Sequence, residues 1–157
     1  MTFLMAAMLV GGLTGLDGTY HESRSGQQEG QGVQKAAAAG KSTMKVHYID
    51  VGQGSAVLVQ SGVHFMLIDG GDSDASSKVV SYLKRQKVKR LDYVVVSHYD
   101  SDHLNGVVGA LNVFKVKRVI APAYTADSRV YESYCNIIAQ KKIATTRPKV
   151  GKKYKMG

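Results

Sequence analysis

The stretch from Val94 to His103 constrains the fold of this chain more than any other, because an apolar run there ends abruptly in polar and metal-capable side chains. The run opens with three consecutive valines, and β-branched residues favour an extended backbone. An uninterrupted apolar strand suits a sheet that is covered on both faces. The polar side chains then stand at the carboxyl end of the strand, where open α/β sheets bind their ligands. The stretch therefore predicts a buried strand followed by a binding loop.

Two imidazoles and two carboxylates lie within six residues of this loop, at His98, Asp100, Asp102 and His103. Side chains at positions 98 and 100 project to the same side of an extended backbone, and the adjacent pair at 102 and 103 can turn in from another direction. Histidine and carboxylate side chains grouped in this way predict a binuclear metal site. The alternative is structural, with Asp102 only capping a helix that begins near Leu104.

Hydrophobic periodicity predicts further strands and helices on both sides of this loop. Strands are predicted at 45–51, 55–60, 63–68, 91–97, 116–122 and from 143, with one more opening at Tyr154. Helices are predicted at 75–87, 105–114 and 128–141, each with an apolar stripe on one face. The resulting order, β-β-β-α-β-α-β-α-β, predicts an α/β layered architecture.

Several other residues have a structural interpretation. His47 and His64 lie in predicted strands without an acidic partner in sequence, and Asp72 precedes a predicted helix that it can cap. Cys135 lies in a helical pattern and suits a small core position; as the single cysteine it excludes a disulfide within the chain. Tyr99 has two open roles, stacking on a substrate base or shielding a metal.

Composition divides the chain into three segments. Residues 1–16 hold an uncharged, nearly all apolar stretch, which is short for a bilayer span of about 20 residues and predicts a signal-like or membrane-anchor segment. Residues 17–43 are rich in Gly, Ser, Gln and Ala and predict a flexible linker. The folded domain is expected over residues 44–157. Either role of the first segment places that domain outside the cytoplasm, extracellular or anchored to a membrane.

The net charge of +9 comes entirely from the folded domain. The chain has 21 Lys and Arg and 12 Asp and Glu, and three of each lie in residues 1–43. A basic domain favours polyanionic partners such as nucleic acid or an anionic membrane surface. The alternative is a basic, soluble surface without such a partner.

Three motifs follow one another along the domain, each at the end of a predicted strand. They are Ile49-Asp50-Val51-Gly52-Gln53-Gly54, Leu67-Ile68-Asp69-Gly70-Gly71 and Ser97-His98-Tyr99-Asp100-Ser101-Asp102-His103-Leu104-Asn105-Gly106. Together they resemble the metallo-β-lactamase fold and, more narrowly, the extracellular hydrolase domain of ComEC-type competence proteins of DNA uptake. The resemblance covers about residues 44–157 and implies a four-layer αβ/βα sandwich with metal ions in a cleft between two sheets.

The resemblance also implies roles for the loop residues. In the family's His-x-His-x-Asp-His pattern, His98 matches the first histidine, Asp100 stands at the second, and Asp102 and His103 match the last two. Each pair would bind one of two divalent ions, zinc or manganese, and the carboxylate at position 100 favours the harder ion. Asp102 would be the catalytic residue that accepts a proton from water, and Asp69 would support a metal ligand from behind.

Two departures from the family pattern bear on this assignment. Ser55 follows the Gly-Gln-Gly turn, where the competence branch usually carries an acid. After His103 the sequence holds no histidine, and Asp127 and Glu132 are its only acids, whereas the family takes further ligands from its second half. We therefore expect the chain to correspond to the N-terminal half of the fold, as a truncated form whose second metal site is incomplete.

Three functions are consistent with these observations. The first is a metal-dependent phosphodiesterase or nuclease acting on extracellular DNA, to whose phosphates the basic charge is attracted. The second is a hydrolase of the same fold that acts on a thioester, a lactam or a small phosphoester. The third is a non-catalytic half-domain that binds metal weakly or pairs with another chain.

Overall fold

The computed structural model describes residues 43–156, so the predicted signal-like segment (1–16) and all but the last residue of the predicted linker (17–43) lie outside the described residues. The described part forms one mixed six-stranded sheet in the order β1-β2-β3-β5-β7-β8, and β4 pairs with β6 in a separate two-stranded sheet. The strands are β1 (Met44–Tyr48), β2 (Val57–Ser61), β3 (His64–Ile68), β4 (Arg90–Leu91), β5 (Tyr93–Val95), β6 (Lys115–Val116), β7 (Arg118–Ile120) and β8 (Ala144–Thr146).

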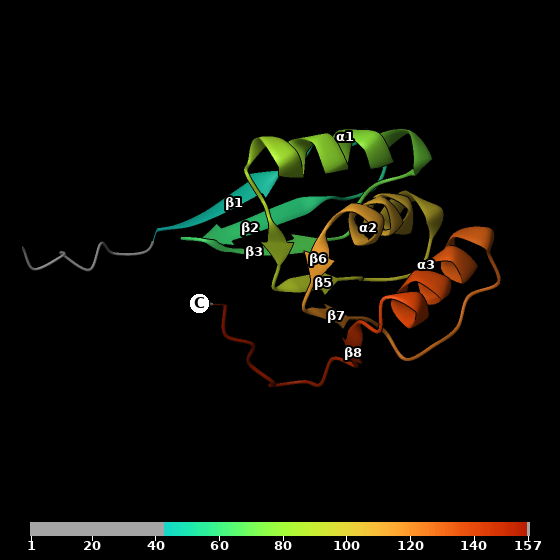
Figure 1. Ribbon diagram of the computed structural model, residues 1–157. Helices are drawn as coiled ribbons and strands as arrows, with labels where there is room; N and C mark the ends of the chain where they lie inside the picture. Colours follow the sequence, from blue (N-terminus) through green and yellow to red (C-terminus); the bar gives the residue numbers. More distant parts are fainter. Residues whose placement is uncertain (1–42, 157) are drawn as a thin grey trace, which may run out of the picture. The chain divides into compact units, whose positions relative to one another are not determined.

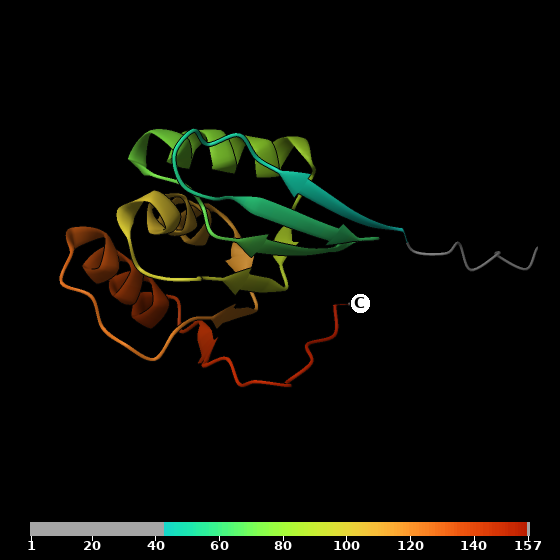
Figure 2. The same ribbon diagram turned by 180° about the vertical axis from the view of Figure 1, so that it is seen from behind.

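Three helices connect the parallel strands: α1 (Ser73–Arg85), α2 (Ser101–Val113) and α3 (Arg129–Gln140). Strands β3, β5, β7 and β8 are parallel and follow one another across the sheet in a single direction. Right-handed crossovers between such strands bring all three helices to the same face. Figures 1 and 2 show this layer, with α2 packed between α1 and α3. The predicted α/β class is confirmed, with one sheet and one helix layer of the four-layer sandwich.

The core lies between the sheet and the helices. Leu58, Leu67, Val94 and Val119 are neighbours in register across four strands, and all are fully buried on the helix-covered face. The helices add the buried side chains of Val79, Leu83, Leu104, Val107 and Leu111. The prediction that the 94–96 strand is covered on both faces is wrong for Val95, which is only half-buried, because the described helices cover a single face.

Helix α2 begins four residues earlier than predicted. The backbone N–H groups of His103 and Leu104 both donate to the carbonyl oxygen of Asp100, at 3.1 and 3.0 Å, so Ser101 is already helical. The sequence pattern could not place this start because the first turn is polar, whereas periodicity follows apolar residues. Acidic side chains are nevertheless favourable at this position, since the first turn of a helix carries free N–H groups and partial positive charge.

The C-terminal tail also differs from its prediction. Among the described residues no strand forms after β8, so the strand expected at Tyr154 is wrong. Instead, the Tyr154 ring packs edge-on against Tyr93, with ring centroids 5.9 Å apart, and the Tyr93 hydroxyl donates to the carbonyl oxygen of Lys155 at 3.1 Å. The tail therefore returns to the start of β5 (Figure 2). No helix within residues 43–156 is long and apolar enough to cross a membrane.

A buried carboxylate organises the end of the sheet at which β3 begins. Asp92 is 6% exposed and accepts hydrogen bonds from the His64 ring at 3.0 Å, the Phe65 amide at 3.3 Å and the Arg90 guanidinium at 3.0 Å. His64 therefore has the structural role predicted for it, although its acidic partner lies 28 residues away in sequence. His47 likewise contacts the Tyr82 hydroxyl through its Nδ1 atom at 2.9 Å.

Replacing Asp92 with asparagine is expected to make stability less dependent on pH in the acid range. Burial by itself would raise the pKa of this carboxyl, but the hydrogen bonds from His64, Phe65 and Arg90 outweigh burial and hold the pKa below the ordinary value of 3.8. The ionised carboxylate therefore stabilises the fold above about pH 4, and this contribution disappears as the pH falls through the lowered pKa. In urea unfolding, Asp92→Asn should lower the free energy of unfolding by about 1–3 kcal/mol at pH 7. The difference from the parent should become smaller below pH 3.8. A loss that is the same at pH 7 and pH 3 would contradict this.

Candidate metal centre

The three sequence motifs meet where β5 ends and α2 begins. After β5 the amide of Val96 still donates to Ile120 in β7, and the chain then leaves the sheet at Ser97. The Asp69-Gly70-Gly71 segment reaches the same place from β3, because the Gly70 amide donates to the carbonyl oxygen of His103 at 2.8 Å. Convergence at the carboxyl ends of parallel strands is the arrangement expected of a ligand site in an α/β sheet.

His98, Asp102 and His103 form a compact group of possible metal ligands. Each offers one ligand atom, and the three atoms lie within 4.8 Å of one another. The two imidazole centroids are 3.9 Å apart, and His103 Nε2 is 3.7 Å from Asp102 Oδ2. All three side chains are partly exposed, so an ion could reach them from solvent.

Asp100 stands outside this group of three. Its carboxylate is 76% exposed and lies 3.5 Å from His98 Nε2. As the N-cap residue of α2 it makes no capping hydrogen bond through its side chain, so the carboxylate is not committed to the helix. The distances are consistent with the predicted pairs, since His98 lies 3.5 Å from Asp100 and His103 lies 3.7 Å from Asp102, and they also bring His98 close to Asp102 and His103. The early start of α2 causes this, since it places Asp102 and His103 in the first helical turn.

Asp69 holds the group from behind, in the position that its motif predicts. The buried carboxylate accepts hydrogen bonds from the Ser97 amide at 2.8 Å, the Ser97 hydroxyl at 2.7 Å and His103 Nδ1 at 2.9 Å. Since an ionised carboxylate only accepts, the proton of the neutral His103 ring resides on Nδ1 and its Nε2 lone pair is free. Asp69 has a φ of 55°, a strained conformation for a residue other than glycine that surrounding contacts must maintain.

Ser97 orients the His98 ring in the same way as Asp69 orients the His103 ring. Its hydroxyl donates to Asp69, so it can only accept at its contact with His98 Nδ1, 2.8 Å away. The proton of the neutral His98 ring then also resides on Nδ1, and Nε2 is free to bind a cation. Both histidines therefore present the same nitrogen to the site. Ser97 was not predicted as a site residue, although it opens the third motif, between the valine strand and His98.

Two close backbone contacts bring the glycine-rich turns onto α2. A Cβ atom on Gly54 would overlap the carbonyl oxygen of Asp102, so the Gly-Gln-Gly turn lies directly against the first turn of α2. Gly70 and Gly106 touch backbone to backbone, so that a Cβ on either would overlap the main chain of the other or its neighbour. This contact sets the distance at which Asp69 reaches His103.

Tyr99 has neither of the roles considered for it. Its side chain is 5% exposed and packs in a cluster with Tyr124, Tyr131 and Tyr134. Its hydroxyl donates to the carbonyl oxygen of Pro122 at 3.0 Å, and burial together with the neighbouring rings raises its pKa to about 12. It anchors the loop to α3. Cys135 is a partly buried residue packed against the core, as predicted, and Asp72 caps α1 by accepting from the Ser73 amide.

Comparison with known proteins relates the fold to one family. The family profile described as "Metallo-beta-lactamase superfamily" matches residues 49–151. The chain is 30% identical over 100 residues to "Recombination protein 2" of Haemophilus influenzae, covering 60% of this chain and 13% of that protein. It is 43% identical over 58 residues to "Competence protein ComA" of Neisseria gonorrhoeae, covering 36% of this chain and 8% of that protein.

Among solved structures, the chain is similar to the metallo-beta-lactamase SMB-1 bound to 2-mercaptoethanesulfonate. The TM-score is 0.53 at 18% identity, over 71% of this chain and 46% of that chain. At this identity the likeness concerns the fold alone. The matched part of the fold includes less than half of that structure, which agrees with the single sheet and single helix layer described above.

Proposed function

The chain belongs to the metallo-beta-lactamase superfamily of hydrolases, and from that premise we propose that it is a metal-dependent phosphodiesterase acting on DNA. The observation that carries the proposal is the group of His98, Asp102 and His103, with both imidazoles oriented through Ser97 and Asp69. DNA as substrate is supported by the similarity to a recombination protein and a competence protein. The excess of cations in residues 44–157 also favours a polyanionic partner for the domain as a whole.

The donors fit a divalent cation. Two imidazole nitrogens with free lone pairs and one carboxylate oxygen make three protein ligands, which is the number that catalytic zinc sites use. The carboxylates of Asp102 and Asp100 make manganese a second candidate, and Asp100 with His98 could serve a second ion. Bound there, a divalent ion would polarise a phosphoryl oxygen and make a nearby water more acidic.

The chain's own residues have separate tasks in this proposal. Asp69 and Ser97 keep the protons of His98 and His103 on Nδ1, so that both Nε2 atoms remain available. The Asp102 carboxylate would accept the proton of the attacking water as the new P–O bond forms, and the ester P–O bond would break with the leaving oxygen taking a proton from solvent. Its side chain is 26% exposed, so it can exchange that proton with solvent after each turnover.

A second candidate function is metal binding without turnover. It is favoured by the small number of donors, because the described residues supply one group of three and the sequence holds no histidine after His103. A divalent ion held by these donors alone would retain several solvent positions and bind weakly. Under this alternative the chain is a non-catalytic half-domain that pairs with another chain.

The test is an assay of the full chain on labelled single- and double-stranded DNA, with manganese or zinc added and with a chelator as blank. We expect metal-dependent cleavage that is abolished in Asp102→Asn and unchanged in Asp127→Asn, a matched change of an exposed acid in a neighbouring loop. Hydrolysis of a thioester, lactam or small phosphoester without DNA cleavage would assign a different hydrolase. Metal binding without any turnover would assign the second candidate.

We also propose that the domain acts outside the cytoplasm, as an extracellular or membrane-anchored protein. The uncharged stretch Phe3–Leu16, followed by a polar segment up to residue 43, supports this location. Fusion of alkaline phosphatase, which is active only after export, to the C-terminus should give an active reporter. Deletion of residues 1–16 should abolish that activity, and a reporter that stays inactive with the full chain would contradict the location.

A further inference from the structure

Most acidic residues and the largest group of cations lie at opposite ends of the sheet, although Arg129 at the start of α3 and Arg147 after β8 are exposed cations at the acidic end. The metal group lies at the end where the parallel strands finish, and each helix begins there because it runs antiparallel to the strands. Eight acidic residues follow strand ends or lie at or near helix starts at this end: Asp50, Asp69, Asp72, Asp74, Asp100, Asp102, Asp127 and Glu132. The remaining acid of the described chain, Asp92, is buried and paired with Arg90 and His64.

The opposite end is strongly basic. Lys87, Lys89, Arg90, Lys115, Lys117 and Lys142 follow helix ends or begin strands there, and all six side chains are exposed. We call the surface formed by these six residues the basic end. At about 3.3 Å per residue, the five residues of β3 separate it from the metal group by about 17 Å. The basic end is therefore not part of the candidate metal centre.

Large apolar side chains project among these cations. Val63 at the tip of the β2–β3 hairpin is 82% exposed, Met44 at the start of β1 is 69% exposed, and Val113 at the end of α2 is 50% exposed. Single exposed aliphatic side chains are normal on protein surfaces, so it is the grouping of these three with six cations at one end of the sheet that bears on the partner. Their mixture with lysines is typical of surfaces that contact an anionic bilayer, where lysines bind headgroups and apolar side chains enter the interface.

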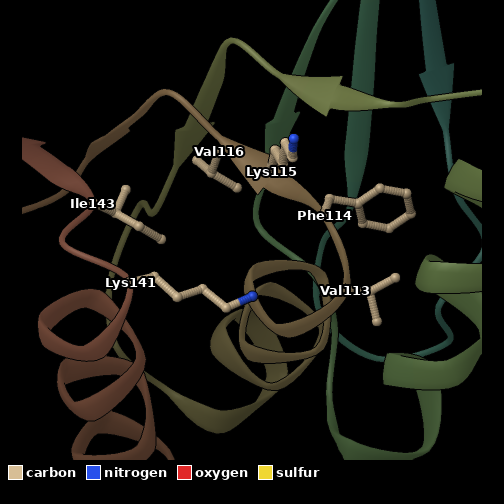
Figure 3. Close-up of a pocket in the computed structure, with 6 residues that line it drawn as sticks. All are labelled: Val113, Phe114, Lys115, Val116, Lys141 and Ile143. Carbon is tan, nitrogen blue, oxygen red and sulfur yellow. The ribbon is translucent and has the colours of Figure 1, made fainter.

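The hollows at this end have the same mixed character. A pocket of about 370 Å³ between α2 and α3 is lined by Val113, Phe114, Lys115, Val116, Lys141 and Ile143 (Figure 3). Lys141 is committed to the fold, because its ammonium donates to the carbonyl oxygens of Leu111 and Asn112 at 2.7 and 2.6 Å and so caps α2. Lys115 has no such partner among the hydrogen bonds of the described residues. A second pocket of about 500 Å³ places Val63 beside Lys87 and Lys89.

We propose that the basic end is a docking surface for an anionic lipid bilayer. The cations meet the phosphate headgroups, Val63, Met44 and Val113 enter the headgroup boundary, and the metal group at the far end of the sheet faces away from the membrane. This arrangement leaves the metal group accessible to a substrate in solution. The inference does not depend on the reaction that the metal group performs.

The test compares two double variants of the full chain with equal change in net charge. Lys89→Gln/Lys117→Gln alters the basic end, and Lys78→Gln/Arg129→Gln alters exposed cations in α1 and at the start of α3. Binding to phosphatidylcholine vesicles with and without phosphatidylglycerol is measured by co-sedimentation. The ratio of the partition coefficients for vesicles with and without phosphatidylglycerol isolates the contribution of anionic lipid. Any binding through the apolar stretch of residues 1–16 is the same in every variant and cancels in this ratio.

We expect the first double variant to lose about thirtyfold in partition to anionic vesicles, from about 1 kcal/mol for each lysine near the surface. The second should lose less than about threefold, and both should keep the circular dichroism of the parent. Any other result overturns the proposal. In particular, equal losses of vesicle binding in the two double variants would indicate unspecific charge attraction. If binding to a labelled DNA duplex, measured in parallel, fell while vesicle binding did not, the surface would be assigned to nucleic acid.

A fluorescence measurement gives the orientation independently. The sequence contains no tryptophan, so Val63→Trp introduces a single reporter at the basic end and Thr125→Trp introduces one in the exposed loop before α3. Anionic vesicles should shift the emission of the first to shorter wavelength and leave the second unchanged. A shift in the second alone would show that the opposite end faces the bilayer and would overturn the proposal.

Discussion

Replacement of His103 by glutamine is expected to weaken zinc binding by the full chain by more than about a hundredfold. His103 is a potential ligand whose Nε2 is left free by the bond of its Nδ1 to Asp69, and glutamine has no imidazole nitrogen to offer. Loss of a residue that merely supports a ligand lowers metal affinity by about 10–100-fold, so loss of the ligand itself should exceed that range. Competition with a chromophoric chelator measures the affinity directly.

His64→Gln is the matched control for this prediction. His64 also contacts a carboxylate, Asp92, but at the opposite end of β3, and glutamine can keep a hydrogen bond to that carboxylate. Zinc affinity should therefore be unchanged in His64→Gln. Asp69→Asn should give an intermediate loss of about 10–100-fold, because the amide no longer holds the His103 proton on Nδ1. Equal zinc affinities in His103→Gln and His64→Gln would show that His98, Asp102 and His103 are not the metal site.

Substitution of Gly106 by alanine is expected to destabilise the domain by about 3 kcal/mol. Helix propensity alone predicts the opposite sign, since alanine is favoured over glycine inside a helix by about 1 kcal/mol. The structure reverses this expectation, because a Cβ on Gly106 would overlap the carbonyl oxygen of Gly70, and backbone atoms cannot move aside as a flexible side chain can. Against a total stability of about 5–15 kcal/mol the loss is large and is readily measured by urea unfolding.

Gly109→Ala is the control in the same helix. Its Cβ would meet the hydroxyl of Ser76, which can rotate away, so the substitution should be neutral or stabilising by up to about 1 kcal/mol. Gly106→Ala should in addition lower metal affinity, because the contact with Gly70 sets how closely Asp69 approaches His103. If both alanine variants were equally stable, the close packing of the Asp69-Gly70-Gly71 segment on α2 would be contradicted.

Much of the fold could be predicted from the sequence because its signals are local. The alternation in β1 to β3, the valine run of β5 and the apolar stripes of α1 and α3 all act over a few residues, and the observed elements follow the predicted order except that the short strands β4 and β6 were not predicted separately from β5 and β7. The boundary at α2 was misplaced because its first turn, Ser101 to His103, has no apolar side chain to carry the helical period. The tail was misplaced because Tyr154 meets a partner, Tyr93, that is 61 residues away in sequence.

The metal residues were recognisable in sequence, but their grouping was not. Imidazoles and carboxylates so close together in sequence indicate metal chemistry by composition alone. Which of them lie close together depends on the backbone between them, and the first turn of α2 brings Asp102 and His103 to His98 while the Asp100 carboxylate stays 3.5 Å from the His98 ring. The sequence could not show that Ser97 and Asp69 orient the rings of His98 and His103, because the contacts join Asp69 to residues 28 and 34 positions away.

By itself the sequence determined the α/β class, the three motifs and the basic balance of residues 44–157, because periodicity, turn residues and charge can be read without knowing what touches what. The tertiary structure alone decided that His98, Asp102 and His103 lie together, that Tyr99 is buried in a cluster of tyrosines, and that eight acids lie at the opposite end of the sheet from the six cations of the basic end. The physical reason is that helices return antiparallel to parallel strands. Residues that alternate along the chain are therefore sorted in space, with helix starts at one end of the sheet and helix ends at the other.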